Sequence, residues 1–97
     1  MEKKTENLLR EVCLIDDMTG MCRSVYVTEE CSELIKELMK LERKKGEIGK
    51  IVDEGVDVLV TVYSLLMSLG VSLEDIEEMM QKKLSRAIIR YLNNGEK

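Results

Sequence analysis

Apolar residues recur at helical spacing in four stretches of the chain, and short breaks that contain glycine or serine separate these stretches. Thr5 and Ser72 are candidate N-cap residues for the first and last stretches, and Gly20 ends the first one in a turn. The pattern predicts an all-α fold with helices over about residues 5–18, 23–44, 50–69 and, after Ser72, up to 91. Residues 93–97 are predicted to be a frayed tail.

The third predicted helix differs from the others because it is apolar on almost every side. Its polar residues are confined to one arc, which holds Asp53, Asp57, Thr61 and Ser64. A helix of this kind has to be buried on nearly every side, and one small bundle cannot cover it. We therefore expect a buried third helix that forms part of an interface between subunits.

Composition favours a single helical domain over residues 1–97, without proline, phenylalanine or tryptophan. The net charge of −4 argues against a nucleic-acid-binding surface, which is normally basic. No apolar run is long enough for a transmembrane span or a signal peptide, so we expect no membrane association. The three cysteines form no C-x-x-C pair, which favours reduced thiols and a cytoplasmic location.

Two pairs of acidic residues have a spacing of three: Glu30 with Glu33 in the second helix, and Glu54 with Asp57 in the third. This spacing puts both members of a pair on one helical face, so the two helices can direct four carboxylates at one point. Four oxygen ligands without nitrogen or sulfur suit a hard divalent cation, Mg²⁺ or Mn²⁺. The pattern therefore predicts a metal site between these helices.

The acidic residues also have a simpler interpretation as a solvated helix flank. Glu33 and Glu37 can form ordinary ion pairs with the lysines nearby, which are Lys36, Lys40 and Lys44. The third helix favours the metal site, because acidic residues within an apolar helix are costly unless they are paired or bound to a metal.

Two groups of basic residues are candidates for binding an anionic substrate. Residues 43–50 hold four cations and two glycines, and they form either a solvated loop or a feature that steers an anion toward the acidic site. The last helix presents Lys83, Arg86 and Arg90 on one face, a placement that also complements the helix dipole. The residues alone leave both alternatives open.

Taken together, these motifs resemble those of the MazG-like, all-α nucleotide pyrophosphohydrolases over about residues 23–91. The E-E-x-x-E motif stands at residues 29–33, and E-x-x-D follows at 54–57 after twenty intervening residues. The family's downstream pattern, K-[LM]-x-[KR]-N-x-x-R-[FY], is similar to residues 83–91, K-L-S-R-A-I-I-R-Y. Ala87 replaces the asparagine of that pattern, a departure that bears on substrate identity more than on metal binding.

The resemblance implies a four-helix-bundle-like, MazG-type fold that is completed by oligomerisation into a homodimer or homotetramer. It also implies Mg²⁺-dependent cleavage of a ribo- or deoxyribonucleoside triphosphate to the monophosphate and pyrophosphate. The implied metal ligands are Glu30, Glu33, Glu54 and Asp57. Glu29 and Glu30 are the implied catalytic carboxylates, with Glu29 orienting or deprotonating the attacking water, and the outer phosphates would bind Lys83, Arg86 and Arg90.

Three alternatives compete with this hypothesis. Residues 71–76, V-S-L-E-D-I, are also similar to phosphoribosyl-ATP pyrophosphohydrolases, which share the metal chemistry and act on a different nucleotide. A non-catalytic acidic helical dimer that serves as an interaction module fits the apolar third helix equally well. A di-iron site in a helix bundle uses Glu-x-x-His motifs, and the chain has no histidine.

Overall fold

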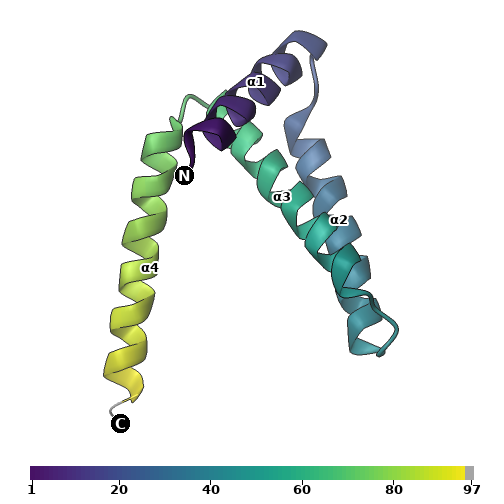
Figure 1. Ribbon diagram of the computed structural model, residues 1–97, viewed down its shortest axis with the longest axis vertical. Helices are drawn as coiled ribbons and strands as arrows, with labels where there is room; N and C mark the ends of the chain where they lie inside the picture. The colour runs from purple at the N-terminus through teal and green to yellow at the C-terminus, as the bar shows by residue number, and fades with distance from the viewer. Residues whose placement is uncertain (96–97) are drawn as a thin grey trace.

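The computed structural model describes residues 1–95, which form four α-helices joined by short connections (Figure 1). The helices are α1 (Lys3–Thr19), α2 (Arg23–Glu42), α3 (Ile48–Ser68) and α4 (Leu73–Gly95). The described residues contain no β-strand, so the prediction of an all-α fold is confirmed.

Two predicted helix ends are confirmed by their hydrogen bonds. Gly20 adopts a left-handed conformation with φ of 68°, and its backbone N–H donates to the carbonyl of Asp17 at 3.3 Å. Glycine carries no Cβ and takes this conformation at little cost, which explains why α1 stops there. At the start of α4, the hydroxyl of Ser72 accepts a hydrogen bond from the backbone N–H of Asp75 at 3.1 Å, as expected of an N-cap.

Two other predicted ends are wrong. α1 begins at Lys3, before Thr5, because the backbone N–H of Glu6 already bonds to the carbonyl of Glu2 at 3.0 Å and closes a turn. α4 continues to Gly95 through most of the predicted frayed tail, since no proline interrupts it. The last two residues of that tail, 96–97, lie outside the described residues.

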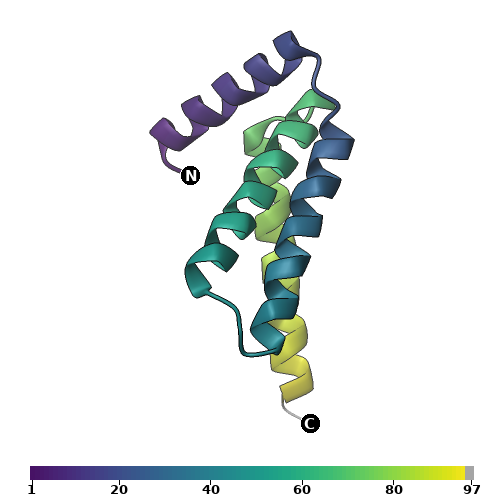
Figure 2. The same cartoon turned by 90° about the vertical axis from the view of Figure 1, so that its right-hand side faces the viewer.

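The four helices form an open V rather than a closed bundle (Figure 1), and Figure 2 shows α2 and α3 side by side in one arm of it. α2 and α3 lie side by side as an antiparallel hairpin, and α1 packs across the end of α3 that leads into α4. Between α3 and α4 the chain changes direction by 118°, so α4 forms the second arm of the V. Within residues 1–95 no single helix is long and apolar enough to cross a bilayer, although α3 and α4 meet that criterion as a bent pair.

The apolar core of the chain lies at the apex of the V. Leu9 of α1 packs there against Leu73 and Ile76 of α4, and the side chains of α3 that complete the cluster are Val60, Tyr63, Leu66 and Met67. Leu73 and Ile76 are the buried residues of α4, whereas residues 78–94 are exposed along the whole second arm. α4 is therefore anchored to its own chain only by its first turns.

A polar network joins α1, α2 and α3 beside this core. The guanidinium of Arg23 donates to the hydroxyl of Ser64 at 3.0 Å and to the carbonyl of Cys13 at 2.8 Å, and it pairs with Asp17 at 2.7 Å. The hydroxyl of Ser64 in turn donates to a carboxylate oxygen of Asp16 at 2.7 Å. Because Arg23 is the first residue of α2, the network fixes that helix against the other two.

One chain does not bury α3 on nearly every side, and the part that it does bury includes two residues of the polar arc. Thr61 and Ser64 of that arc are buried, while Val52, Val56 and Leu59 are 58%, 49% and 57% exposed. Ser64 is buried because Arg23 and Asp16 supply its hydrogen bonds, whereas Asp53 and Asp57 of the same arc are exposed. The apolar side is exposed because α4 turns away. The described chain does not close into a four-helix bundle by itself, and completion by oligomerisation stays a prediction.

Candidate metal centre

Three carboxylates from two helices meet on the α2–α3 hairpin. Glu30 belongs to α2, and Glu54 and Asp57 belong to α3. One carboxylate oxygen of each residue lies within 4.8 Å of the corresponding oxygens of the other two. The spacing of three in α3 places Glu54 and Asp57 on the face that Glu30 approaches, so the chain brings together three of the four residues expected to bind a metal.

The electrostatics of this triad, Glu30, Glu54 and Asp57, favour a bound cation. Burial raises the pKa of Glu54 above its ordinary value, and the charges of Asp57 and Glu30 raise it further. The phenol of Tyr26 has a raised pKa for the same reasons, burial first and then the charges of Glu30 and Asp57. Within residues 1–95 none of the three carboxylates takes part in an ion pair, so their mutual repulsion is not relieved by a lysine or arginine.

Glu33 and Glu29 lie outside the triad. The carboxylate of Glu33 accepts a hydrogen bond from Lys36 at 3.2 Å, and Glu37 accepts one from Lys40 at 3.1 Å. These are the ion pairs along the helix that the sequence offered as an alternative. The pair of Glu33 joins two exposed side chains and is therefore weak, whereas the side chain of Glu37 is only 12% exposed. The side chain of Glu29 is exposed.

The spacing of the carboxylate oxygens in the triad is close to that required by a small hard cation. Mg²⁺ holds its oxygen ligands at about 2.0–2.1 Å, so two ligands of one ion lie at most about 4.2 Å apart. The oxygens of the triad lie within 4.8 Å of one another, which is close to this value, and small rotations of the side chains would bring them within about 4.2 Å. Glu30 and Glu54 are half-buried and Asp57 is exposed, which leaves one side accessible to water or to phosphate oxygens. The three side chains therefore suit Mg²⁺ or Mn²⁺.

The basic residues predicted on the last helix are not brought to the triad by their own chain. Lys83, Arg86 and Arg90 lie on the exposed arm formed by α4, which extends away from the hairpin (Figure 1). Lys83 lines an apolar cavity of about 370 Å³ between the ends of α3 and α4, next to Leu66 and Met80. Any contact between these cations and the triad would have to come from a second copy of the chain.

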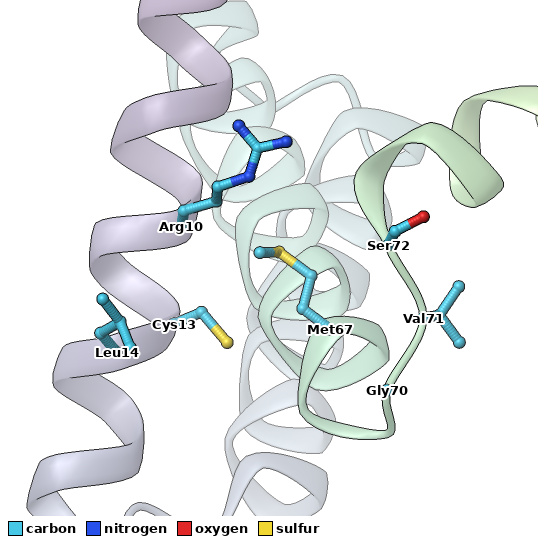
Figure 3. Close-up of a pocket in the computed structure, with 7 residues that line it drawn as sticks. All are labelled: Arg10, Cys13, Leu14, Met67, Gly70, Val71 and Ser72. Carbon is cyan, nitrogen blue, oxygen red and sulfur yellow. The ribbon is translucent and has the colours of Figure 1, made fainter.

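The cavity at the apex of the V is chemically different from the triad. It has a volume of about 430 Å³, and Figure 3 shows Arg10 and Cys13 of α1 on one side, Met67 of α3 between, and the Gly70–Ser72 turn on the other. The guanidinium of Arg10 is already paired with Glu74 at 2.9 Å. Because its cation is paired and most of its wall is apolar, this cavity is a poor candidate for a phosphate or metal site.

Two residues that support the site were not predicted from the sequence. Tyr26 precedes Glu30 by four positions, so its ring shares a face with the triad, a signal that the helical spacing contained. Arg23 fixes the start of α2 through buried polar groups on α1 and α3, and no local sequence pattern predicts partners so distant in the chain.

Comparison with protein-family models, with curated proteins and with solved structures finds no significant match to this chain.

Proposed function

We propose that the protein is a Mg²⁺-dependent nucleotide pyrophosphohydrolase that cleaves a ribo- or deoxyribonucleoside triphosphate to the monophosphate and pyrophosphate. The observation that carries the proposal is the triad of Glu30, Glu54 and Asp57, which gathers three carboxylates without a cationic partner within residues 1–95. Carboxylates held apart from lysine and arginine bear a cost that a divalent cation removes. The motifs that resemble the MazG-like enzymes select the nucleotide chemistry.

In this proposal the protein acts mainly by positioning charged groups. A bound Mg²⁺ would supply charge neutralisation at the phosphate oxygens and a template for the attacking water. Glu30, Glu54 and Asp57 would hold the cation, and Glu33 would be a fourth ligand if its exposed pair with Lys36 opened. Glu29, next to Glu30 in sequence, is the proposed group that orients the water or accepts its proton.

The proposal includes a second copy of the chain, in a homodimer or homotetramer. The apolar side of α3 and the second half of α4 are both exposed, and the apolar residues of α4 include Leu84, Ile88 and Leu92. A partner that covers these surfaces would remove a large apolar area from water. It would also allow Lys83, Arg86 and Arg90 of one chain to contact the substrate that another chain binds. We place this reaction on free nucleotides in the cytoplasm, without nucleic acid or membrane.

A second candidate is a non-catalytic interaction module. It is favoured by the same exposed apolar surfaces and by the ordinary ion pairs that Glu33 and Glu37 form with Lys36 and Lys40. In that case the triad would be only a concentration of surface charge. Metal binding and turnover separate the two candidates.

The test is turnover of nucleotides in the presence of Mg²⁺, with products resolved by chromatography. The substrates are the canonical ribo- and deoxyribonucleoside triphosphates and, as a separate sample, phosphoribosyl-ATP. We expect monophosphate and pyrophosphate, lost in Glu54→Gln and retained in Glu11→Gln, which neutralises an exposed carboxylate of α1. Turnover of phosphoribosyl-ATP alone would assign the second nucleotide chemistry, and no turnover with any substrate would favour the interaction module.

A further inference from the structure

A second charged cavity lies at the closed end of the α2–α3 hairpin. It has a volume of about 410 Å³, and all of its lining residues carry charge: Lys40, Arg43, Lys45, Lys50, Glu37 and Glu47. Four cations against two carboxylates give the lining a net charge of +2 (4 − 2). This sign is opposite to that of the triad on the same hairpin and to that of the whole chain.

The loop that carries these cations is folded back onto α2 by specific backbone features. The backbone N–H of Lys45 donates to the carbonyl of Lys40 at 2.9 Å, and Lys44 has a positive φ of 59°. A Cβ on Gly46 would lie 2.8 Å from the Cα of Leu41, so only glycine allows this close approach. The loop is therefore a compact turn that holds its basic side chains against the last turn of α2.

The charges in this cavity are only partly neutralised by the protein. Lys40 is paired with Glu37 at 3.1 Å, whereas within residues 1–95 Arg43, Lys45 and Lys50 form no ion pair. Glu47 is exposed. Three unpaired cations around one cavity repel each other, and an anion with several charges would stabilise them together.

The cavity and the triad lie on the same side of the hairpin. On α2, Glu37 follows Glu30 by seven residues, and on α3, Lys50 precedes Asp57 by seven. Seven residues are about two helical turns, or about 10 Å, and they return a side chain to nearly the same face. The cavity is therefore displaced from the triad by about 10 Å toward the loop, along both helices.

We propose that this cavity binds the non-reacting, terminal phosphates of a polyphosphate chain whose other end is held by a cation at the triad. The inference rests on the function proposed for the triad and adds that the protein selects phosphate chains by their length. A chain held at the triad has to extend along the hairpin to reach Arg43 and Lys45, so a longer chain gains contacts that pyrophosphate lacks. The loop thus supplies, within one chain, phosphate contacts that the cations of α4 do not provide there.

The experiment measures the affinity of inorganic pyrophosphate, tripolyphosphate and tetrapolyphosphate by calorimetry, at constant free Mg²⁺. The test variant is Arg43→Gln/Lys45→Gln, and the matched control is Lys3→Gln/Lys4→Gln, which removes the same charge from exposed positions of α1. We expect affinity to rise with chain length in the wild type and control. The loop variant should bind tripolyphosphate about tenfold more weakly, because two solvent-exposed charge contacts are lost, and its length dependence should flatten. Melting temperatures confirm that each variant is folded.

Equal tripolyphosphate affinity in the wild type and the loop variant overturns the inference, as does a lack of binding to the wild type. Equal losses in the loop variant and the control also overturn it, because they indicate a general charge effect. The nucleotide assay is scored separately. An affinity that depends on the loop, without turnover, would support the phosphate site and reject the proposed hydrolase. Turnover with an affinity that does not depend on the loop would support the hydrolase and reject the phosphate site.

Discussion

In the α2–α3 hairpin, charged residues of two helices face one another, whereas residues 78–94 of α4 are exposed along their length. The hairpin holds its acidic triad and its cationic cavity without help from α4. The second half of α4 combines exposed apolar side chains with Lys83, Arg86 and Arg90. From this difference we propose that the hairpin carries the chemistry and that α4 and the exposed side of α3 carry the association between chains.

The largest expected effect comes from placing charge on the apolar side of α4. Leu84 and Ile88 are about 60% exposed and one turn apart, so Leu84→Asp/Ile88→Asp should change the protein from an oligomer to a monomer, as measured by light scattering. Lys82→Asp changes the charge by the same amount about 140° away around the helix, and it should leave the mass unchanged. A monomeric wild type, or an unchanged mass in the double variant, would remove α4 from the interface.

The next effect concerns the network that fixes the hairpin against α1. Arg23→Leu removes the hydrogen bonds to Ser64 and Cys13 and the pair with Asp17, so the free energy of unfolding should fall by about 2–3 kcal/mol. Arg10→Leu, which removes two ion pairs at the surface, with Glu74 and Glu6, should cost less than about 1 kcal/mol. Chemical denaturation measures both, and equal losses would contradict a special role for Arg23.

The third prediction concerns the pH dependence of stability in metal-free protein. Burial and then the charges of Asp57 and Glu30 raise the pKa of Glu54 above its ordinary value of 4.5, so the folded state binds this proton more tightly than the unfolded state. The resulting stabilisation is fully present below pH 4.5 and is lost as the pH rises through the raised pKa. Glu54→Gln should weaken this loss of stability, and an identical pH profile in the variant would show that Glu54 is not destabilised by its neighbours.

The sequence predicts the helices well because their apolar periodicity and turn residues are local signals. The spacing of Glu54 and Asp57 likewise predicts their shared face, and the hairpin then adds Glu30. Glu33 can either pair with Lys36 on its own helix or turn toward the triad, and spacing alone does not decide between the two. The divergence of α4 is determined by how the Gly70–Ser72 turn packs at the apex, which is a tertiary property.

The burial of Thr61 and Ser64 shows a second limit of periodicity. A polar arc on an apolar helix is normally assigned to solvent, yet here Arg23 and Asp16 satisfy Ser64 inside the chain. The apolar side of α3 remains exposed instead. Hydrophobic pattern therefore identifies the surfaces that need a partner, but it does not determine which of them the chain itself covers.

The most direct test of the central claim is the melting temperature as a function of Mg²⁺ concentration, for the wild type and three matched variants. Binding to the folded state at 100 times the dissociation constant should add about 2.7 kcal/mol to the free energy of unfolding. We predict a rise for the wild type and Glu11→Gln, a smaller rise for Glu33→Gln, and none for Glu54→Gln. An equal rise in Glu54→Gln and the wild type, or no rise in either, would contradict a metal centre at Glu30, Glu54 and Asp57.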